Sequence, residues 1–291
     1  MLYTIKNSAM TVTVDSLGAQ LMSITAADGT EYLWNGDKTY WGNRSPVLFP
    51  AVGRQTEGRY TYKGKSYNLG CHGFARNCEF TPIVEEEGRL ILAISDSEET
   101  RQVYPFAFEF SVSFELEDKT LAVTYAVENR TRGDMYFGLG SHPGFRIPLE
   151  EGKKFEDYSL TFASASQPNR CLLSENYLMA SRGVPYYLEN GTTLHLRHDL
   201  FDNDAVILDH MDKTYTLSAG EGSRGVTLHC PKARYLGVWH TPKTDAPFVC
   251  LEPWVSLPAR DSIVEDFAQK GDLIRLEAGE LYDHTWTITI F

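Results

Sequence analysis

The sequence predicts an all-β protein in which two large antiparallel sheets pack face to face. Residues 106–117 and 121–128 alternate between apolar and polar side chains, which is typical of strands with one buried and one solvent-exposed face. Asp118-Lys119-Thr120 joins them as a turn. Apolar residues at helical spacing are almost absent. The predicted strands outnumber those of one flat open sheet, so we expect two sheets within a single domain that spans residues 1–291.

The remaining elements follow in chain order. Residues 1–34 have the pattern of a meander of short strands, with a turn signal at residues 27–30. A hairpin joins residues 59–62 to residues 66–69 through Lys63-Gly64-Lys65, a short loop that contains glycine. Residues 262–269 are the only predicted helix. Further strands are predicted at residues 80–84, 89–95, 158–163, 193–198, 205–208, 214–218, 226–229, 235–240, 247–254, 273–276 and 282–290.

Charge and cysteine content narrow the function classes. The chain carries 27 Lys and Arg against 39 Asp and Glu, a net charge of −12. An acidic surface repels nucleic acid and anionic membranes, so we expect a neutral small molecule as the partner. We find no apolar stretch of signal-peptide or membrane-span type. Five cysteines at unrelated spacings are typical of a reducing compartment, which predicts a cytoplasmic protein.

The predicted hairpin brings two polar residues together. Arg54 precedes its first strand and His72 follows its second, so a two-stranded ribbon returns both to the same end. Cys71, next to His72, raises the alternative of a thiol nucleophile. Neighbours on an extended strand point to opposite faces, however, and this disfavours a base and nucleophile pair.

Two further polar residues stand out. His142 lies in residues 138–146, a Gly- and Pro-rich loop between strands, and such loops on a rigid scaffold commonly carry sites. Glu252 ends an apolar strand and is followed by Pro253 and Trp254, so we expect burial to raise the pKa of its carboxyl. The alternative is that Glu252 has a purely structural role. A histidine and a carboxylate suffice for acid–base work on a neutral polyol. On these grounds a sugar-isomerising enzyme and a carbohydrate-binding module both remain open.

Other polar and aromatic residues allow a functional and a structural interpretation. Trp34, Tyr40 and Trp41 either stack on a sugar ring or pack in the core. His195 and His198 would point to opposite faces of a strand, so we interpret them as surface or hydrogen-bonded residues and expect no metal site.

Four ordered motifs resemble the aldose 1-epimerase (galactose mutarotase-like) family. They are Gly53-Arg54 with the hairpin after it, His72-Gly73-Phe74, Ser141-His142-Pro143-Gly144-Phe145 and Cys250-Leu251-Glu252-Pro253-Trp254. The resemblance implies a β-supersandwich, no cofactor, and interconversion of the α and β anomers of a free hexose.

The resemblance also implies the role of each site residue. Arg54 and His72 would bind and orient the sugar, His142 would be the general acid and Glu252 the general base. Asp204, preferred over Asp202 because it directly precedes an apolar strand, would contact the sugar together with Trp239. The Gly144-Phe145 sequence after the His-Pro pair differs from that of the familiar galactose enzymes, so the identity of the sugar is left undecided.

Three alternatives remain at this stage. A hexose 6-phosphate epimerase of the same fold would need a basic pocket, for which Arg44, Arg76 and Arg146 are candidates. A glycoside hydrolase needs two carboxylates across the bond, and the motifs supply only Glu252 securely. A non-catalytic sugar-binding protein needs no His–Glu pair. A monomer and a homodimer are both compatible with the sequence.

Overall fold

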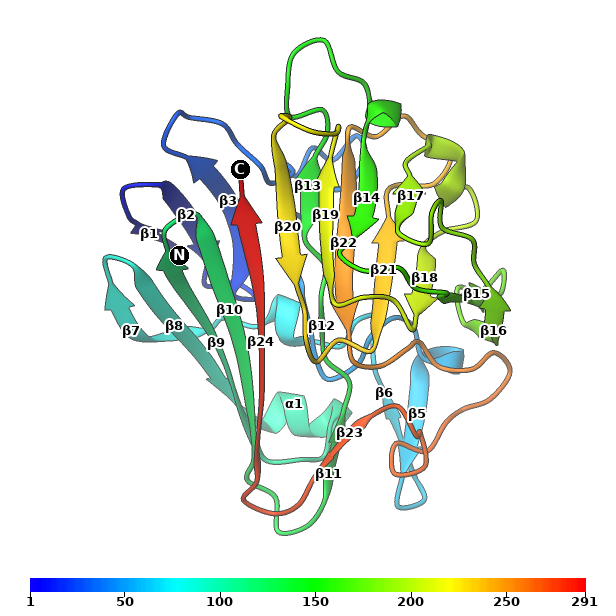
Figure 1. The fold of residues 1–291 in the computed structure, drawn as a ribbon. Helices are drawn as coiled ribbons and strands as arrows, with labels where there is room; N and C mark the ends of the chain where they lie inside the picture. Colours follow the sequence, from blue (N-terminus) through cyan, green and yellow to red (C-terminus); the bar gives the residue numbers. More distant parts are fainter.

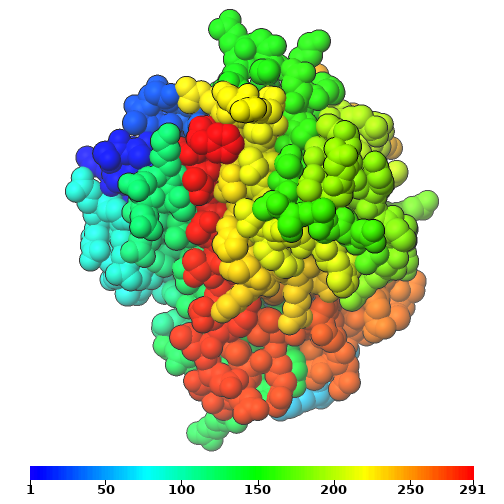
Figure 2. All heavy atoms as spheres, in the orientation of Figure 1, coloured from blue at the N-terminus to red at the C-terminus, as the bar shows by residue number.

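Two large antiparallel sheets form the body of the computed structural model, which describes residues 1–291 (Figure 1). The nine-stranded sheet has the order β17-β14-β19-β20-β24-β10-β9-β8-β7, and Figure 2 shows β24, in red, at the surface between β10 and β20. Its strands are β7 (Thr81–Glu86), β8 (Arg89–Ser95), β9 (Phe108–Glu117), β10 (Thr120–Asn129), β14 (Ser159–Phe162), β17 (Thr193–His195), β19 (Thr214–Ser218), β20 (Gly225–His229) and β24 (Leu281–Ile290).

The eight-stranded sheet has the order β16-β15-β18-β21-β22-β12-β4, and β13 also pairs with β22. Its strands are β4 (Val47–Leu48), β12 (Gly140–Ser141), β13 (Gly144–Arg146), β15 (Asn169–Leu173), β16 (Met179–Pro185), β18 (Val206–Asp209), β21 (Tyr235–Trp239) and β22 (Phe248–Trp254). The all-β prediction is therefore confirmed.

Smaller elements complete the fold. Three strands form a separate sheet: β1 (Leu2–Lys6), β2 (Met10–Asp15) and β3 (Gln20–Ala26). Two pairs are β5 (Arg59–Tyr62) with β6 (Lys65–Asn68), which is the predicted hairpin, and β11 (Met135–Phe137) with β23 (Ile274–Leu276). The helices are α1 (Glu98–Val103) and four 3-10 turns, Thr56–Gly58, Ala75–Asn77, Phe155–Asp157 and His198–Phe201. No helix has the length and apolar character that a membrane crossing requires.

The main core lies between the two large sheets and contains 63 buried residues. Strand β9 shows why the sequence alternates, because Phe108, Phe110, Val112 and Phe114 all point into this core. The central strands β18, β21 and β22 of the eight-stranded sheet are buried on both faces. Val206 and Leu208 of β18 join the main core, whereas Ile207 between them belongs to a separate cluster of nine buried residues on the other face.

The predicted helix at residues 262–269 is wrong, because this segment forms turns. Its Phe267 ring stacks on Tyr60 with centroids 3.6 Å apart, and the carbonyl of Glu265 accepts from the N–H of Thr61 at 2.9 Å, so tertiary contacts decide its conformation rather than local pattern. The observed α-helix starts instead after Ser97, whose side chain forms a capping box with Thr100.

Two predicted strands also differ from the structure. Residues 31–34 make only isolated bridges, and the strand predicted at residues 193–198 ends at His195 before a 3-10 turn. Strands β4, β11, β12, β13, β15 and β16 were not predicted, because they are too short or too polar to show alternation.

Candidate active site

The strand register places His142 opposite Glu252. Gly140 of β12 pairs with Trp254 of β22, and Gly144 of β13 pairs with Cys250. The residue midway between the two glycines, His142, therefore faces the residue midway between Cys250 and Trp254, which is Glu252. Directly opposite residues of an antiparallel pair project to the same side of a sheet, so the two side chains meet.

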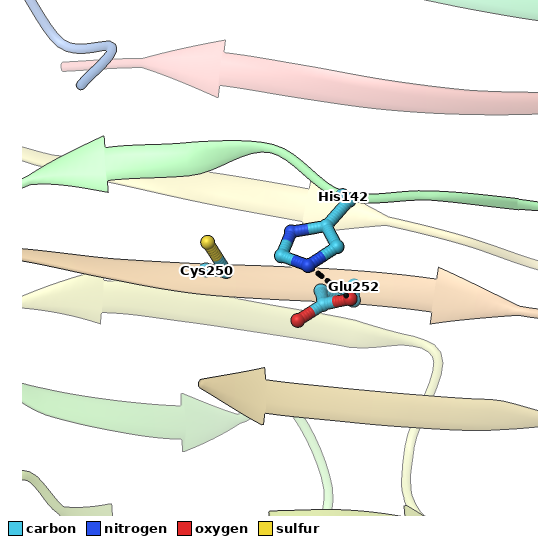
Figure 3. Close-up of side chains that lie close together, drawn as sticks. All are labelled: His142, Cys250 and Glu252. Carbon is cyan, nitrogen blue, oxygen red and sulfur yellow. Dashed lines mark ion pairs between the residues drawn. The ribbon is translucent and has the colours of Figure 1, made fainter. Parts of the chain in front are cut away.

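The two side chains form a buried acid–base pair. Nε2 of His142 lies 3.2 Å from Oε2 of Glu252, and Figure 3 shows this contact as a dashed line. Burial, and then the nearby charge of Asp204, raise the pKa of Glu252 well above its usual range. Burial, and then the nearby His72, lower the pKa of His142 well below its usual range. The environment thus favours the neutral form of both groups, and the pair can hold and exchange one proton.

Two further side chains lie against His142. The Trp41 ring stacks on the imidazole with centroids 4.8 Å apart, which shields it from water. Cys250 projects from the same side of β22 as Glu252 (Figure 3). One donor atom of each of His142, Cys250 and Glu252 lies within 4.8 Å of the others, a spacing that a metal ion could bridge. Such an ion would displace the proton that the acid–base pair shares.

The β5–β6 hairpin delivers His72 and Arg54 as the sequence predicts. The N–H of His72 donates to the carbonyl of Gly53 at 2.9 Å, and the N–H of Gly53 donates to Nδ1 of His72 at 3.1 Å. Since Nδ1 accepts, a neutral His72 carries its proton on Nε2 and can donate it to a ligand. Burial, then the charges of Arg76 and Arg54, lower the pKa of His72 to about 3, so the ring is neutral at physiological pH.

A cavity of about 460 Å³ opens over this pair. All six residues predicted for the site line it: Arg54, His72, His142, Asp204, Trp239 and Glu252. Burial raises the pKa of Asp204, while hydrogen bonding from the Trp239 side chain and the Ala205 backbone opposes this rise. The cavity is of the size that small-molecule sites usually have.

Of the two aspartates considered for sugar contact, Asp204 lines this cavity and Asp202 does not. Of the three arginines considered for a phosphate, only Arg76 lines it. Arg44 instead donates to the carbonyl of Met22, and Arg146 is exposed on β13. The cavity therefore carries less positive charge than we expected for a hexose 6-phosphate epimerase.

The aromatic residues divide between core and cavity. Trp34 is buried and stacks on Phe248 with centroids 4.6 Å apart, whereas Trp41 lines the cavity. Tyr177 also lines the cavity, and its ring lies 4.9 Å from the Arg54 guanidinium. Sequence reasoning missed Tyr177, because it belongs to a turn between two unpredicted strands and no motif marks it.

The structure also decides whether Cys71 is placed to act as a nucleophile. Cys71 lies with His72 in a turn rather than a strand, and both line the cavity, so the expectation that they point apart is wrong. Burial raises the pKa of the Cys71 thiol, which is the opposite of what an activated nucleophile needs.

His195 and His198 are hydrogen-bonded outside the cavity, as predicted: His195 contacts Ser159 and Glu189, and His198 contacts His240.

Solved structures share this fold. The galactose mutarotase related enzyme from Lactobacillus acidophilus is 33% identical, with a TM-score of 0.93 over 100% of this chain and 97% of that one. A galactose mutarotase-like protein from Lactobacillus casei is 30% identical, with a TM-score of 0.93 over 100% of both chains. The fold is therefore that of a galactose mutarotase-like β-sandwich.

Sequence comparisons give the family. The family model for aldose 1-epimerase matches residues 1–289. The chromosomal protein LacX of Lactococcus lactis subsp. lactis is 33% identical over 300 residues, which cover 98% of this chain and 99% of LacX. The chain belongs to the aldose 1-epimerase family.

Proposed function

We propose that the protein is an aldose 1-epimerase that interconverts the α and β anomers of a free hexose by general acid–base catalysis. The observation that carries this proposal is the buried pair formed by His142 and Glu252 at the floor of the cavity, 3.2 Å apart. Anomer interconversion needs one group to remove the proton of the C1 hydroxyl and a second group to deliver a proton to the ring oxygen that is bonded to C1. The pair has the residue types and the spacing for both tasks.

The reaction would proceed by opening and closing of the ring. Glu252 removes the proton of the C1 hydroxyl while His142 gives a proton to the ring oxygen, and the C1–O5 bond breaks. The open-chain aldehyde rotates about C1–C2 and closes on its other face with the two roles reversed. All protons are returned, so no cofactor or co-substrate is consumed.

Four residues would hold the sugar in place. His72 donates from Nε2 to a sugar oxygen, since Gly53 occupies its Nδ1. Arg54, which follows Gly53 in the chain and lines the same cavity, donates to other sugar hydroxyls. Asp204 accepts a hydrogen bond from a sugar hydroxyl, and Trp239 offers an apolar surface to the ring. We further propose a cytoplasmic location, which the five free cysteines support.

The test is anomeric exchange at equilibrium, followed by NMR with D-glucose and D-galactose. We expect the protein to speed the exchange of both anomers with either sugar. Methyl glycosides are the matched control, because they lack the C1 hydroxyl proton and should stay unchanged. No acceleration with any free hexose, alongside acceleration with hexose 6-phosphates, would replace the proposal by a sugar phosphate epimerase.

A further inference from the structure

A thiol completes a group of three side chains around the acid–base pair. Cys250 and Glu252 lie two positions apart on β22, so their side chains project from the same face of the strand (Figure 3). His142 lies opposite Glu252 through the pairings of β12 and β13 with β22. The Cys250 thiol is free and fully buried, and it does not line the cavity over the pair. The proposed ring opening therefore gives this thiol no task.

The three side chains have the composition and spacing of a zinc site. Proteins bind Zn²⁺ through thiolate sulfur, imidazole nitrogen and carboxylate oxygen, and many zinc sites combine three such ligands with one water. One donor atom of each of Cys250, His142 and Glu252 lies within 4.8 Å of the other two, and no other His, Cys, Asp or Glu side chains form such a group. Ligand atoms around tetrahedral zinc lie about 3.3–3.8 Å apart, so small side-chain rotations close the group around an ion.

Two buried atoms of this group lack a partner. Nδ1 of His142 and Oε2 of Glu252 make no hydrogen bond, since Oε2 approaches Nε2 of His142 at 3.2 Å without the alignment of one. Buried polar atoms in proteins are nearly always partnered, so these two mark a place for a further ligand. His142 and Glu252 line the cavity, whereas Cys250 lies behind them. An ion therefore enters from the cavity and keeps one coordination position open toward it.

Charge and ligand type favour zinc over the hard cations. A thiolate and a carboxylate together carry two negative charges, which equal the charge of Zn²⁺, so the occupied site is neutral as its burial requires. A soft thiolate selects zinc over Mg²⁺ and Ca²⁺, which prefer oxygen ligands. Coordination displaces the thiol proton and the proton that His142 and Glu252 share. The occupied pair can then neither remove nor deliver a proton.

We propose that His142, Cys250 and Glu252 form an inhibitory zinc site, in which Zn²⁺ binds at the acid–base pair and stops anomer interconversion. The binding stands on the three side chains alone. The inhibition rests on the proposed function, because the ion occupies the pair that carries out the proposed reaction. The active form of the protein is the one with this site empty.

The test measures zinc binding and mutarotation with the wild type, Cys250→Ala, Cys250→Ser and Cys71→Ala. Cys71 is the matched control, because its thiol lines the cavity but does not belong to the group of three. Zn²⁺ is titrated calorimetrically, and the mutarotation rate of each protein at a fixed free zinc concentration is compared with its own rate in excess EDTA. Co²⁺ serves as a spectroscopic probe, since a thiolate bound to Co²⁺ gives a charge-transfer band. Mg²⁺ is the hard-ion control.

We expect one Zn²⁺ per chain on the wild type and on Cys71→Ala, with inhibition over the same range of free zinc and recovery in EDTA. Loss of a group that merely supports a metal ligand costs about 10–100-fold in affinity, so both Cys250 variants should bind zinc and be inhibited at least tenfold more weakly. The Co²⁺ band should appear only in the proteins that keep Cys250. Mg²⁺ should neither bind nor inhibit.

The inference is overturned if the wild type binds no zinc, if the Cys250 variants bind it as tightly as the wild type, or if bound zinc leaves mutarotation unchanged. The Co²⁺ band of the wild type and of Cys71→Ala decides the question even where a Cys250 variant fails to fold, because its absence rules out coordination by the Cys250 thiolate.

Failure of the proposed function has a different signature. In that case none of the proteins accelerates anomeric exchange, even in EDTA. Zinc binding that depends on Cys250, together with the Co²⁺ band, would then still establish the metal site, and the absence of both would remove it.

Discussion

His142 lies directly opposite Glu252 across the β13–β22 and β12–β22 pairings, with Nε2 and Oε2 3.2 Å apart. The antiparallel register on either side of His142 brings the two residues together. The acid–base pair is thus built into the rigid eight-stranded sheet, where its geometry is preorganised for proton transfer.

The pH profile of kcat/KM should be bell-shaped, because the working pair holds one proton. Addition of a second proton removes the base, and loss of the only proton removes the acid. The two limbs report apparent pKa values of the pair rather than of either residue. Burial moves the pKa of His142 down and that of Glu252 up, so we expect the acid limb below pH 6.5 and the alkaline limb above pH 4.5. An acid limb above pH 6.5, or an alkaline limb below pH 4.5, would contradict this expectation.

Asp204→Asn should shift the alkaline limb of that profile to lower pH. The negative charge of Asp204 opposes ionisation of Glu252 and so raises its pKa, second only to burial. Removing the charge makes loss of the shared proton easier. The same variant should raise KM if Asp204 binds the sugar. An alkaline limb that stays in place or moves upward would show that the charge of Asp204 does not act on the pair.

Trp41→Ala should lower kcat and raise the acid limb. The indole ring stacks on His142 and shields it from water, which is part of the burial that holds the pKa of His142 low. Without the ring, water reaches the imidazole and its pKa moves back toward the usual value. Trp41→Phe retains a stacking surface and should recover most of the activity. Equal losses in the two variants would argue against a role for stacking.

Gly73→Ala should destabilise the protein much more than Gly64→Ala. Both glycines have similar positive φ values, 73° and 74°, so both substitutions incur about 1–2 kcal/mol of backbone strain. A Cβ at Gly73 would lie 2.2 Å from the carbonyl oxygen of Phe49, whereas Gly64 has open space around it. Crowding of this kind adds about 1–3 kcal/mol. Urea unfolding measures the difference, and equal midpoints would refute the argument.

His284→Phe should flatten the loss of stability at acid pH. His284 is 2% exposed and neither ring nitrogen has a hydrogen-bond partner. Burial lowers its pKa from 6.5 to about 4, so between these values the unfolded chain binds more protons and stability falls as pH decreases. Such a shift corresponds to roughly 3 kcal/mol. Thermal unfolding at pH 7 and pH 4 should show a smaller difference for the variant, and an unchanged difference would contradict this assignment.

The sequence predicts the sheets well because alternation is a local signal. Residues 106–117 and 121–128 carry it over many positions, and β9 and β10 confirm it with bounds close to those expected. Residues 262–269 show the limit of local patterns. Their conformation is decided by contacts with distant residues, since Phe267 stacks on Tyr60 and the carbonyl of Glu265 accepts from the N–H of Thr61, and no short window contains these pairs.

The site is predictable only in part. Its residues could be selected because each stands out chemically or belongs to a motif, and the structure brings them into one cavity. The pairing of β12 and β13 with β22 is a long-range register that the sequence does not display. For the same reason Tyr177 could not be found without coordinates.

The most direct test of the account is polarimetry of freshly dissolved α-D-glucose and α-D-galactose with the wild-type protein and with Glu252→Gln. The variant keeps the shape of the side chain but cannot accept a proton, and a proton-transfer group typically contributes about 10²–10⁴-fold in rate. The account predicts acceleration by the wild type and a loss of that size in the variant. Equal acceleration by both proteins would show that Glu252 is not the base.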